Sequence, residues 1–343
     1  MAQESLGIKT GISESSSDAV KLPIRSVVGY VIVAAFLVLC GHYVITNRSD
    51  FAFLTTVSLP ELMAASVLIL AGYTINAYQL SLFLRHFGIT VGCAEMMALT
   101  AGMLLGNLVI PMRGGTGALA FYLKKVHHLD FHAFATIYGG TALLVALINT
   151  GLAGVGLILL GCLHGFFNVV LTLVVAVAFG GLLYLSVFPP PVKWNGTGFL
   201  GMIFDAINAW HVMVRDRRLL VRQILVTVAM AFAIMAAFYM IYLSLGVHFP
   251  LSAVLISSSM GNLASIVPLT PGSLGVFDAV VIQIPQIFGL DPARSIAGTL
   301  VFRILSFSWA LAIGIPGMIY IMKRTPGNKT DRSSTRQGAR FRR

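Results

Sequence analysis

The sequence predicts an all-α polytopic membrane protein with about six full membrane spans and two re-entrant helical hairpins. Its 343 residues are 57% hydrophobic and only 10% charged, whereas a soluble domain carries about 25% charged residues. Several apolar segments are long enough to cross a bilayer, and two others are broken by proline and glycine. Most of the protein surface is therefore expected to face lipid rather than water.

Six apolar segments are long enough to span a hydrocarbon core about 30 Å thick. They are residues 27–46, 60–84, 131–161, 166–188, 220–245 and 295–322. No small-residue cleavage site follows the first segment, so we expect it to remain as a span. The chain then divides into a cytoplasmic arm (1–26), a transmembrane domain (27–322) and a basic cytoplasmic tail (323–343).

Two further apolar regions are interrupted in the middle. Region 95–122 contains the run PMRGGTG at residues 111–117, and region 251–288 contains PLTPGSLG at residues 268–275. Non-helical backbone at bilayer depth is tolerated only where protein buries it or where it lines a water-filled cavity. One such break in each half is typical of a polar site between inverted repeats. Sequence similarity between the halves is weak, so the inverted repeat is a hypothesis.

Basic residues indicate how the broken regions are threaded, because cytoplasmic loops are enriched in lysine and arginine. The tail, the connector 189–221, Arg85 and the Lys124-Lys125 pair should all be cytoplasmic. All of these basic segments lie on the cytoplasmic side if both broken regions are re-entrant hairpins. The first hairpin then enters the membrane from the cytoplasm, and the second enters it from outside. Six crossings then place both termini in the cytoplasm, with Arg48 and Arg294 as exceptions on the outer side.

The net charge of +11 does not indicate a nucleic-acid partner, because the basic residues stand at segment ends and in the tail. There they can contact anionic headgroups, so membrane lipids are the expected partners and the inner cell membrane the expected location. Stretch 199–214 is expected to be an interfacial helix. Trp194 and Trp210 are expected to anchor the connector at the headgroup level.

The first hairpin carries a stripe of small residues. Ala98, Gly102 and Gly106 recur at every fourth position, which leaves one helix face open to close approach. The stripe indicates either a hairpin packed tightly around a site or ordinary helix packing.

The two broken runs resemble a known family, the flippase-like transmembrane domain of bacterial lysylphosphatidylglycerol synthases. The family's first motif, N-x-x-x-P-x-R-x-G-acid, is matched except that Thr116 replaces the acid. The second, P-x-T-P-G-G-x-G-x-x-acid, is matched except that Ser273 replaces a glycine. The matching residues are Asn107, Pro111, Arg113, Gly115, Pro268, Thr270, Pro271, Gly272, Gly275, Asp278 and, downstream, Arg303. The resemblance covers roughly residues 27–322.

The resemblance implies that the protein moves a lipid with a polar headgroup between leaflets, or presents it. In the synthases a separate soluble domain transfers the amino acid, and only a short polar tail follows Met322 here, so we expect no aminoacyl transfer. The family also carries an acidic and a basic residue in the span after the first hairpin. This chain has the uncharged run IYGGT at residues 137–141 instead.

Arg113 and Arg303 are the main candidates for binding an anion. An arginine inside the membrane costs at least ~2.5 kcal/mol and usually marks a pathway or a partner. The pair is expected either to bind phosphate, whose oxygens match the guanidinium fork, or to form a structural ion pair with Asp278. Asp278 is in turn either a counter-ion or a proton-coupled carboxylate.

The other candidates belong to the two breaks. Glycine admits positive φ and close backbone approach, and exposed amides at helix N-termini favour an anion. Asn107 and Asn262, which precede the breaks, either satisfy freed backbone groups or touch the ligand. The expected substrate-binding residues are Asn107, Arg113, Gly115, Thr116, Asn262, Thr270, Gly272, Asp278 and Arg303.

Enzyme signatures are absent from the sequence, which lacks G-x-S-x-G, H-E-x-x-H and Walker A motifs. The cluster His127, His128, Asp130 and His132 completes no known metal-ligand spacing, and Asp278 and Glu95 are the only acids expected near the site. We therefore expect no catalysis, metal or cofactor. The leading hypothesis is translocation or binding of a polar, anionic lipid. The alternative is a non-transporting scaffold or accessory subunit for an enzyme of lipid or envelope synthesis, which the missing charges favour.

Overall fold

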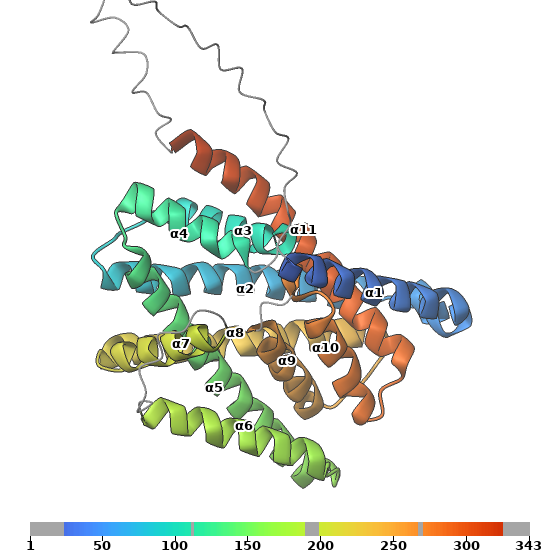
Figure 1. Cartoon of the computed structure of the whole chain (residues 1–343). Helices are drawn as coiled ribbons and strands as arrows, with labels where there is room; N and C mark the ends of the chain where they lie inside the picture. Colours follow the sequence, from blue (N-terminus) through green and yellow to red (C-terminus); the bar gives the residue numbers. More distant parts are fainter. Residues whose placement is uncertain (1–23, 111–112, 189–198, 267–269, 325–343) are drawn as a thin grey trace, which may run out of the picture.

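The computed structural model describes residues 24–110, 113–188, 199–266 and 270–324, and none of these residues lies in a strand (Figure 1). The helices are α1 (Ile24–Thr46), η1 (Arg48–Thr56), α2 (Leu59–His86), α3 (Cys93–Val109), α4 (Gly114–His127), α5 (Phe131–His164), α6 (Val169–Val187), α7 (Phe199–Met213), α8 (Arg217–Ser244), α9 (Leu251–Ile266), η2 (Pro271–Ser273), α10 (Val276–Ile287) and α11 (Pro292–Arg324). The all-helical fold class is confirmed for the described residues.

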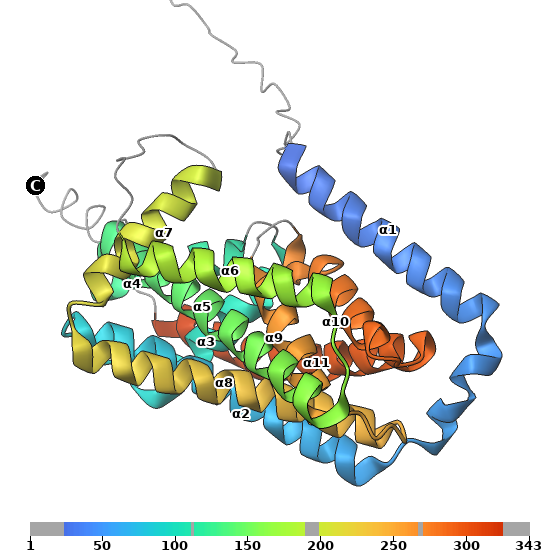
Figure 2. The same ribbon diagram turned by 90° about the horizontal axis from the view of Figure 1, so that it is seen from below.

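Among the described residues, five helices have the length and hydropathy of a membrane span: α2, α5, α6, α8 and α11. They correspond to five of the six predicted spans, with ends shifted by a few residues. The remaining predicted span, residues 27–46, lies in α1, a helix of 23 residues. This helix lies to one side of the other helices (Figure 2). Its role as a span stays a prediction. Most of the arm and of the tail, and Trp194, lie outside the described residues.

The two broken regions form two helical hairpins, α3 with α4 and α9 with α10, whose helices pack against each other. Ile110 leaves the first helix with an extended backbone, φ −99° and ψ 122°, as a residue before proline tends to do. The expected turn at 111–117 is too long, because helix α4 already begins at Gly114. Helix α5 crosses the bundle obliquely and contacts both α4 and α9 (Figure 1).

The small-residue stripe of α3 serves two neighbours. A Cβ placed on Gly106 would lie 2.7 Å from the Cα of Gly115, so α3 and α4 meet backbone to backbone. A Cβ on Gly317 of α11 would lie 2.8 Å from the Cα of Ala98. The stripe therefore holds the hairpin together and also fixes it against α11.

Side-chain and backbone contacts join the helix ends into two sets. At one end of the bundle, the joined pairs are His86 with Asp216, Trp210 with Ser186, and His127 with Glu95. At the other end they are Ser58 with Ser244, Phe166 with Phe288, and Arg294 with Phe53. Each set gathers helix ends that the threading derived from charge places on one side of the membrane.

Helix α7 packs against α5, and a Cβ on Gly139 would lie 2.9 Å from the Cα of Ala206. Trp210 is only 6% exposed, and its indole Nε1 donates to the carbonyl oxygen of Ser186 at 2.9 Å. The expectation that Trp210 anchors the connector among headgroups is therefore wrong, because protein side chains cover the ring.

Candidate functional site

Arg113 stands at the break of the first hairpin, where it forms the N-cap of α4. Its backbone is left-handed, with φ 57° and ψ 43°, a conformation that costs a non-glycine residue roughly 1–2 kcal/mol. Its Nη2 donates to the carbonyl oxygen of Ser265 at 2.7 Å. Ser265 lies in the last turn of α9, where carbonyls lack an intrahelical donor and a cation is favoured. Arg113 thereby caps a helix of the other hairpin.

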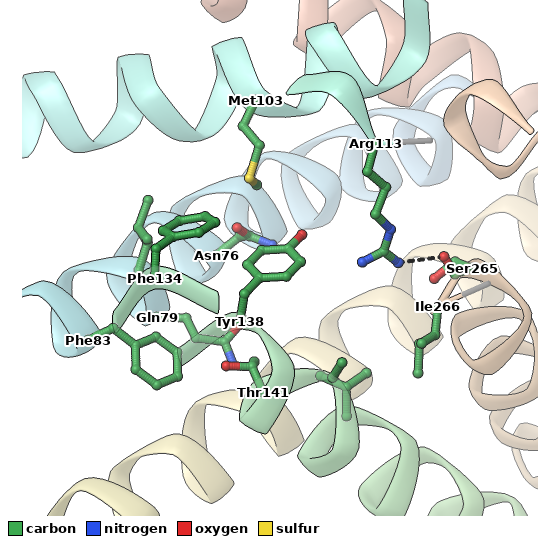
Figure 3. Close-up of a pocket in the computed structure, with 13 residues that line it drawn as sticks. Asn76, Gln79, Phe83, Met103, Arg113, Phe134, Tyr138, Thr141, Ser265 and Ile266 are labelled. Atoms are coloured by element: carbon green, nitrogen blue, oxygen red, sulfur yellow. Dashed lines mark hydrogen bonds between the residues drawn. The ribbon is translucent and has the colours of Figure 1, made fainter. Parts of the chain in front are cut away.

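Arg113 also lines a cavity of about 170 Å³ whose walls come from α2, α3, α5 and the end of α9. Figure 3 shows the guanidinium reaching toward Ser265, with Tyr138 and Met103 on its other side. Apart from Arg113, the polar side chains of the wall are neutral: Asn76, Gln79, Tyr138, Thr141 and Ser265. The lining residues that the structure describes include no carboxylate.

The charge of Arg113 is left uncompensated by the described part of the chain. None of the ion pairs found there involves Arg113. Its guanidinium carries five N–H donors, and the hydrogen bond to Ser265 uses one of them. The Cζ atom lies 5.9 Å from the centre of the Tyr138 ring, which is within the range of a cation–π contact.

Asn107 and Thr116 support Arg113 from within the hairpin. The side-chain oxygen of Asn107 accepts from the backbone N–H of Thr116 at 3.0 Å, and its Nδ2 donates to the Thr116 hydroxyl at 3.2 Å. That hydroxyl lies 3.3 Å from the Tyr138 hydroxyl. Of the two roles considered for Asn107, the structure shows the satisfaction of a freed backbone group at the start of α4.

The second break is built around Arg303. Its Nε donates to Asp278 Oδ1 at 2.6 Å, and its Nη1 and Nη2 donate to the carbonyl oxygens of Gly272 and Ser273 at 3.0 and 3.4 Å. The other oxygen of Asp278 accepts from the backbone N–H of Gly275 at 2.9 Å. Of the roles weighed for the arginines, the ion pair with Asp278 is present for Arg303. Arg113 and not Arg303 lines the cavity.

The two breaks touch each other. The hydroxyl of Ser273 donates to the carbonyl oxygen of Ser265 at 3.2 Å, the same oxygen that Arg113 binds. A Cβ on Gly272, whose φ is 58°, would lie 2.7 Å from a methyl group of Leu108 near the end of α3. Residues of both breaks are thus brought to one region, as an internal site requires.

Three other candidate residues lie apart from the cavity. Asn262 donates to the Asn149 side chain of α5 at 3.1 Å rather than to either break. Thr270 is 3% exposed, and its hydroxyl has no hydrogen-bond partner among the described residues. Glu95 was expected near the site, but it lies in the first turn of α3, where it accepts from Tyr122 at 2.8 Å and contacts His127 at 3.0 Å.

Sequence reasoning missed most of the cavity wall. Tyr138, Gln79 and Ser265 carry no motif and lie in three different helices. Tyr138 had one signal, since it stands in the run where the family carries charged residues. The others are recognisable only from their place around Arg113.

Among the described residues, five helices long and apolar enough to span a membrane and two broken hairpins that meet at an arginine-lined cavity define a polytopic helical membrane protein. The chain belongs to the family described as the lysylphosphatidylglycerol synthase TM region, whose sequence profile matches residues 25–314. The predicted resemblance is therefore confirmed.

Two relatives carry the same name. A UPF0104 membrane protein of Methanothermobacter thermautotrophicus is 24% identical over 328 residues, which cover 86% of this chain and 94% of the relative. A second UPF0104 membrane protein of that organism is 27% identical over 153 residues, which cover 41% of this chain and 44% of the relative.

Proposed function

We propose that this protein binds a polar, anionic lipid inside the membrane and moves it between leaflets, with Arg113 holding the phosphate of its headgroup. The observation that carries the proposal is the uncompensated guanidinium of Arg113 in a cavity whose described lining has no carboxylate. An unpaired arginine inside a membrane is costly and marks a functional site by default. A phosphate would supply the missing negative charge.

The cavity chemistry suits a headgroup. Guanidinium binds phosphate oxygens through parallel hydrogen bonds. The side-chain amide of Asn76, and that of Gln79, whose Nε2 also donates to Thr227 at 3.1 Å, can bond further headgroup oxygens. Pockets that enclose drug-sized ligands run to about 300–1,000 Å³, so a cavity of about 170 Å³ is too small for a whole lipid. The acyl chains would remain in the bilayer.

The proposed threading has six spans, two re-entrant hairpins and both termini in the cytoplasm. The proposed location is the inner cell membrane. The two sets of joined helix ends support this threading, since His86 meets Asp216 at the predicted inner side and Ser58 meets Ser244 at the outer side. The hairpin helices also support it, because α3 has 17 residues and α10 has 12, fewer than the roughly 20 of a typical span.

One observation favours the alternative function, a membrane module that binds lipid and presents it to an enzyme of lipid or envelope synthesis without transporting it. The carboxylate of Asp278 is bound by Arg303 and by the N–H of Gly275. Glu95 is bound by Tyr122 and contacts His127. Neither acid is placed to couple transport to a proton gradient. Both functions are non-enzymatic, and they share the Arg113 cavity.

The test is leaflet exchange in liposomes that contain the purified protein and phosphatidylglycerol or phosphatidylcholine labelled on an acyl chain, so that the headgroup stays native. We expect exchange of phosphatidylglycerol to exceed that of phosphatidylcholine. Arg113→Gln should reduce it by about 10- to 100-fold, since a hydrogen bond to a charged group contributes about 1.5–3 kcal/mol. The control is Arg294→Gln, because Arg294 is exposed and lies beside Phe53 at the predicted outer end of the bundle, away from the cavity.

The same samples separate the two functions. Binding of phosphatidylglycerol that depends on Arg113, without any exchange, would replace the translocase by the presenting module. Exchange that is equal for both lipids and insensitive to Arg113→Gln would refute the proposed site.

A further inference from the structure

A second basic site lies at the end of the bundle where α2 ends and α8 begins. Arg85 and His86 come from the last turn of α2, and Arg218 and Arg222 come from the first turns of α8. With Asp216, Leu82 and Leu219 they enclose a pocket of about 250 Å³. This pocket shares no lining residue with the Arg113 cavity.

Positive charge in this pocket exceeds negative charge. Asp216 is its one acid, and that carboxylate is already engaged with His86 at 3.2 Å and with the backbone N–H groups of Arg218 and Leu219 at 3.0 and 3.1 Å. No ion pair in the described part of the chain involves the guanidinium of Arg85, Arg218 or Arg222. Three guanidinium groups therefore face one pocket without a counter-ion.

The arrangement is unfavourable without a ligand. Arg218 and Arg222 are four residues apart on one helix face, where like charges repel, and Arg85 adds a third positive charge from the neighbouring helix. Arg215 and Arg217 are close in sequence but do not line the pocket. Of the three arginines in the first turns of α8, Arg218 and Arg222 thus line the pocket and Arg217 does not.

We propose that Arg85, Arg218 and Arg222 form a binding site for a phosphate group, supplied by an anionic lipid at the membrane surface. The pocket lies between the end of α2 and the start of α8, two helices long and apolar enough to cross a membrane, and the ends of spanning helices meet the headgroup region. Basic pockets between transmembrane helices on the cytoplasmic side bind such headgroups. The exposed arginines can also bind a soluble phosphate compound by the same chemistry, which the experiment separates.

The experiment compares two charge-matched double variants in nanodiscs. Arg218→Gln/Arg222→Gln removes two charges from the pocket, and Arg215→Gln/Arg217→Gln removes two charges from the same connector outside it. Native mass spectrometry counts retained lipids, and thermal unfolding is measured in phosphatidylcholine discs with or without phosphatidylglycerol. The wild type and the outside variant should retain phosphatidylglycerol and melt higher in its presence. The pocket variant should bind it at least about tenfold more weakly.

The source of the phosphate is settled by adding inorganic phosphate to discs of phosphatidylcholine alone. No shift in the melting temperature supports a lipid headgroup, whereas a saturable shift that Arg218→Gln/Arg222→Gln abolishes assigns the pocket to a soluble phosphate compound. An equal loss of lipid binding in both double variants would overturn the proposal, because it would reflect surface charge in general.

Folding and independence have their own readouts. The arginines are exposed, so replacing them should not lower the melting temperature in phosphatidylcholine discs and should raise it slightly by relieving like-charge repulsion. Arg218→Lys/Arg222→Lys should keep part of the lipid binding through charge alone. The pocket shares no lining residue with the proposed headgroup cavity. Arg113→Gln should therefore leave lipid retention at this pocket intact.

Discussion

Arg113 and Ser273, one from each broken hairpin, donate to the same carbonyl oxygen of Ser265, at 2.7 and 3.2 Å. Both residues have left-handed backbones, with φ values of 57° and 53°. Strained backbone persists only where surrounding structure holds it, and it clusters at functional sites. The Arg113 bond thus joins the two hairpins at the wall of the cavity, while the Ser273 bond lies within the second hairpin.

The backbone contact between α3 and α4 predicts a sharp difference between two neighbouring glycines. Gly115→Ala should lower stability by about 1–3 kcal/mol or more through overpacking, because its Cβ would lie 2.1 Å from Met103 O and 2.6 Å from Asn107 N. Gly117→Ala, where the Cβ meets nothing within 4 Å, is the matched control. Thermal unfolding in detergent measures both, and equal melting temperatures would contradict the packing described.

The Arg303–Asp278 pair should be needed for folding stability. Its side chains are only 14% and 2% exposed, so Asp278→Asn or Arg303→Gln alone should cost about 3–5 kcal/mol by leaving a buried charge unpaired. The double variant should cost less than the sum of the two single losses. Unfolding in detergent gives all three values, and strictly additive losses would show that the two side chains are not coupled.

The bond from Asn107 to the start of α4 predicts graded effects at one position. Asn107→Leu removes the side-chain bonds to the Thr116 N–H and hydroxyl, which still have the Arg113 carbonyl and the Tyr138 hydroxyl as partners, and should cost about 0.5–1.5 kcal/mol. Asn107→Asp keeps the acceptor for the N–H and should cost less. If both variants melt alike, the side-chain acceptor is not what holds the hairpin.

Asp216 predicts an acid-sensitive step in stability. The backbone N–H of Leu219, followed by that of Arg218 and by His86, lowers the pKa of this carboxyl. The stabilisation is present above the unfolded pKa of about 3.9 and is lost as pH falls through the lower folded value. Asp216→Asn keeps a helix cap without a charge, so below about pH 4 the wild type should lose stability more steeply than the variant. Parallel pH curves for the two proteins would contradict this.

Natural cysteines test the threading. Cys93 and Cys162 are exposed, and the threading places Cys93 at the cytoplasmic side and Cys162 outside. A membrane-impermeant maleimide should label Cys162 in intact cells and Cys93 only after the membrane is opened. In a Cys40→Ser background, which removes the partly buried third cysteine, Cys162→Ser should abolish the first signal. Labelling of both cysteines from the same side would refute the re-entrant first hairpin.

Much of the fold could be predicted from the sequence, because each span is a local property of the chain. About 20 apolar residues form a helix that spans a bilayer, and proline stops α3 at a position readable from residues 110 and 111. The start of α4 was harder to predict, because glycine can occupy either a loop or the first turn of a helix. Burial of Trp210 could not be foreseen, because it depends on α7 packing against α5.

The sequence alone determined the membrane class, the family and the two breaks, since composition and motif spacing need no partner. Only the tertiary structure decided what each arginine does. Ser265 lies 152 residues from Arg113 in the chain, while Asp278 lies 25 residues from Arg303. Both arginines stand in apolar sequence, and the partners that folding delivers decide which charge is neutralised. Asp278 pairs with Arg303, and Arg113 is left with a carbonyl oxygen and an open cavity.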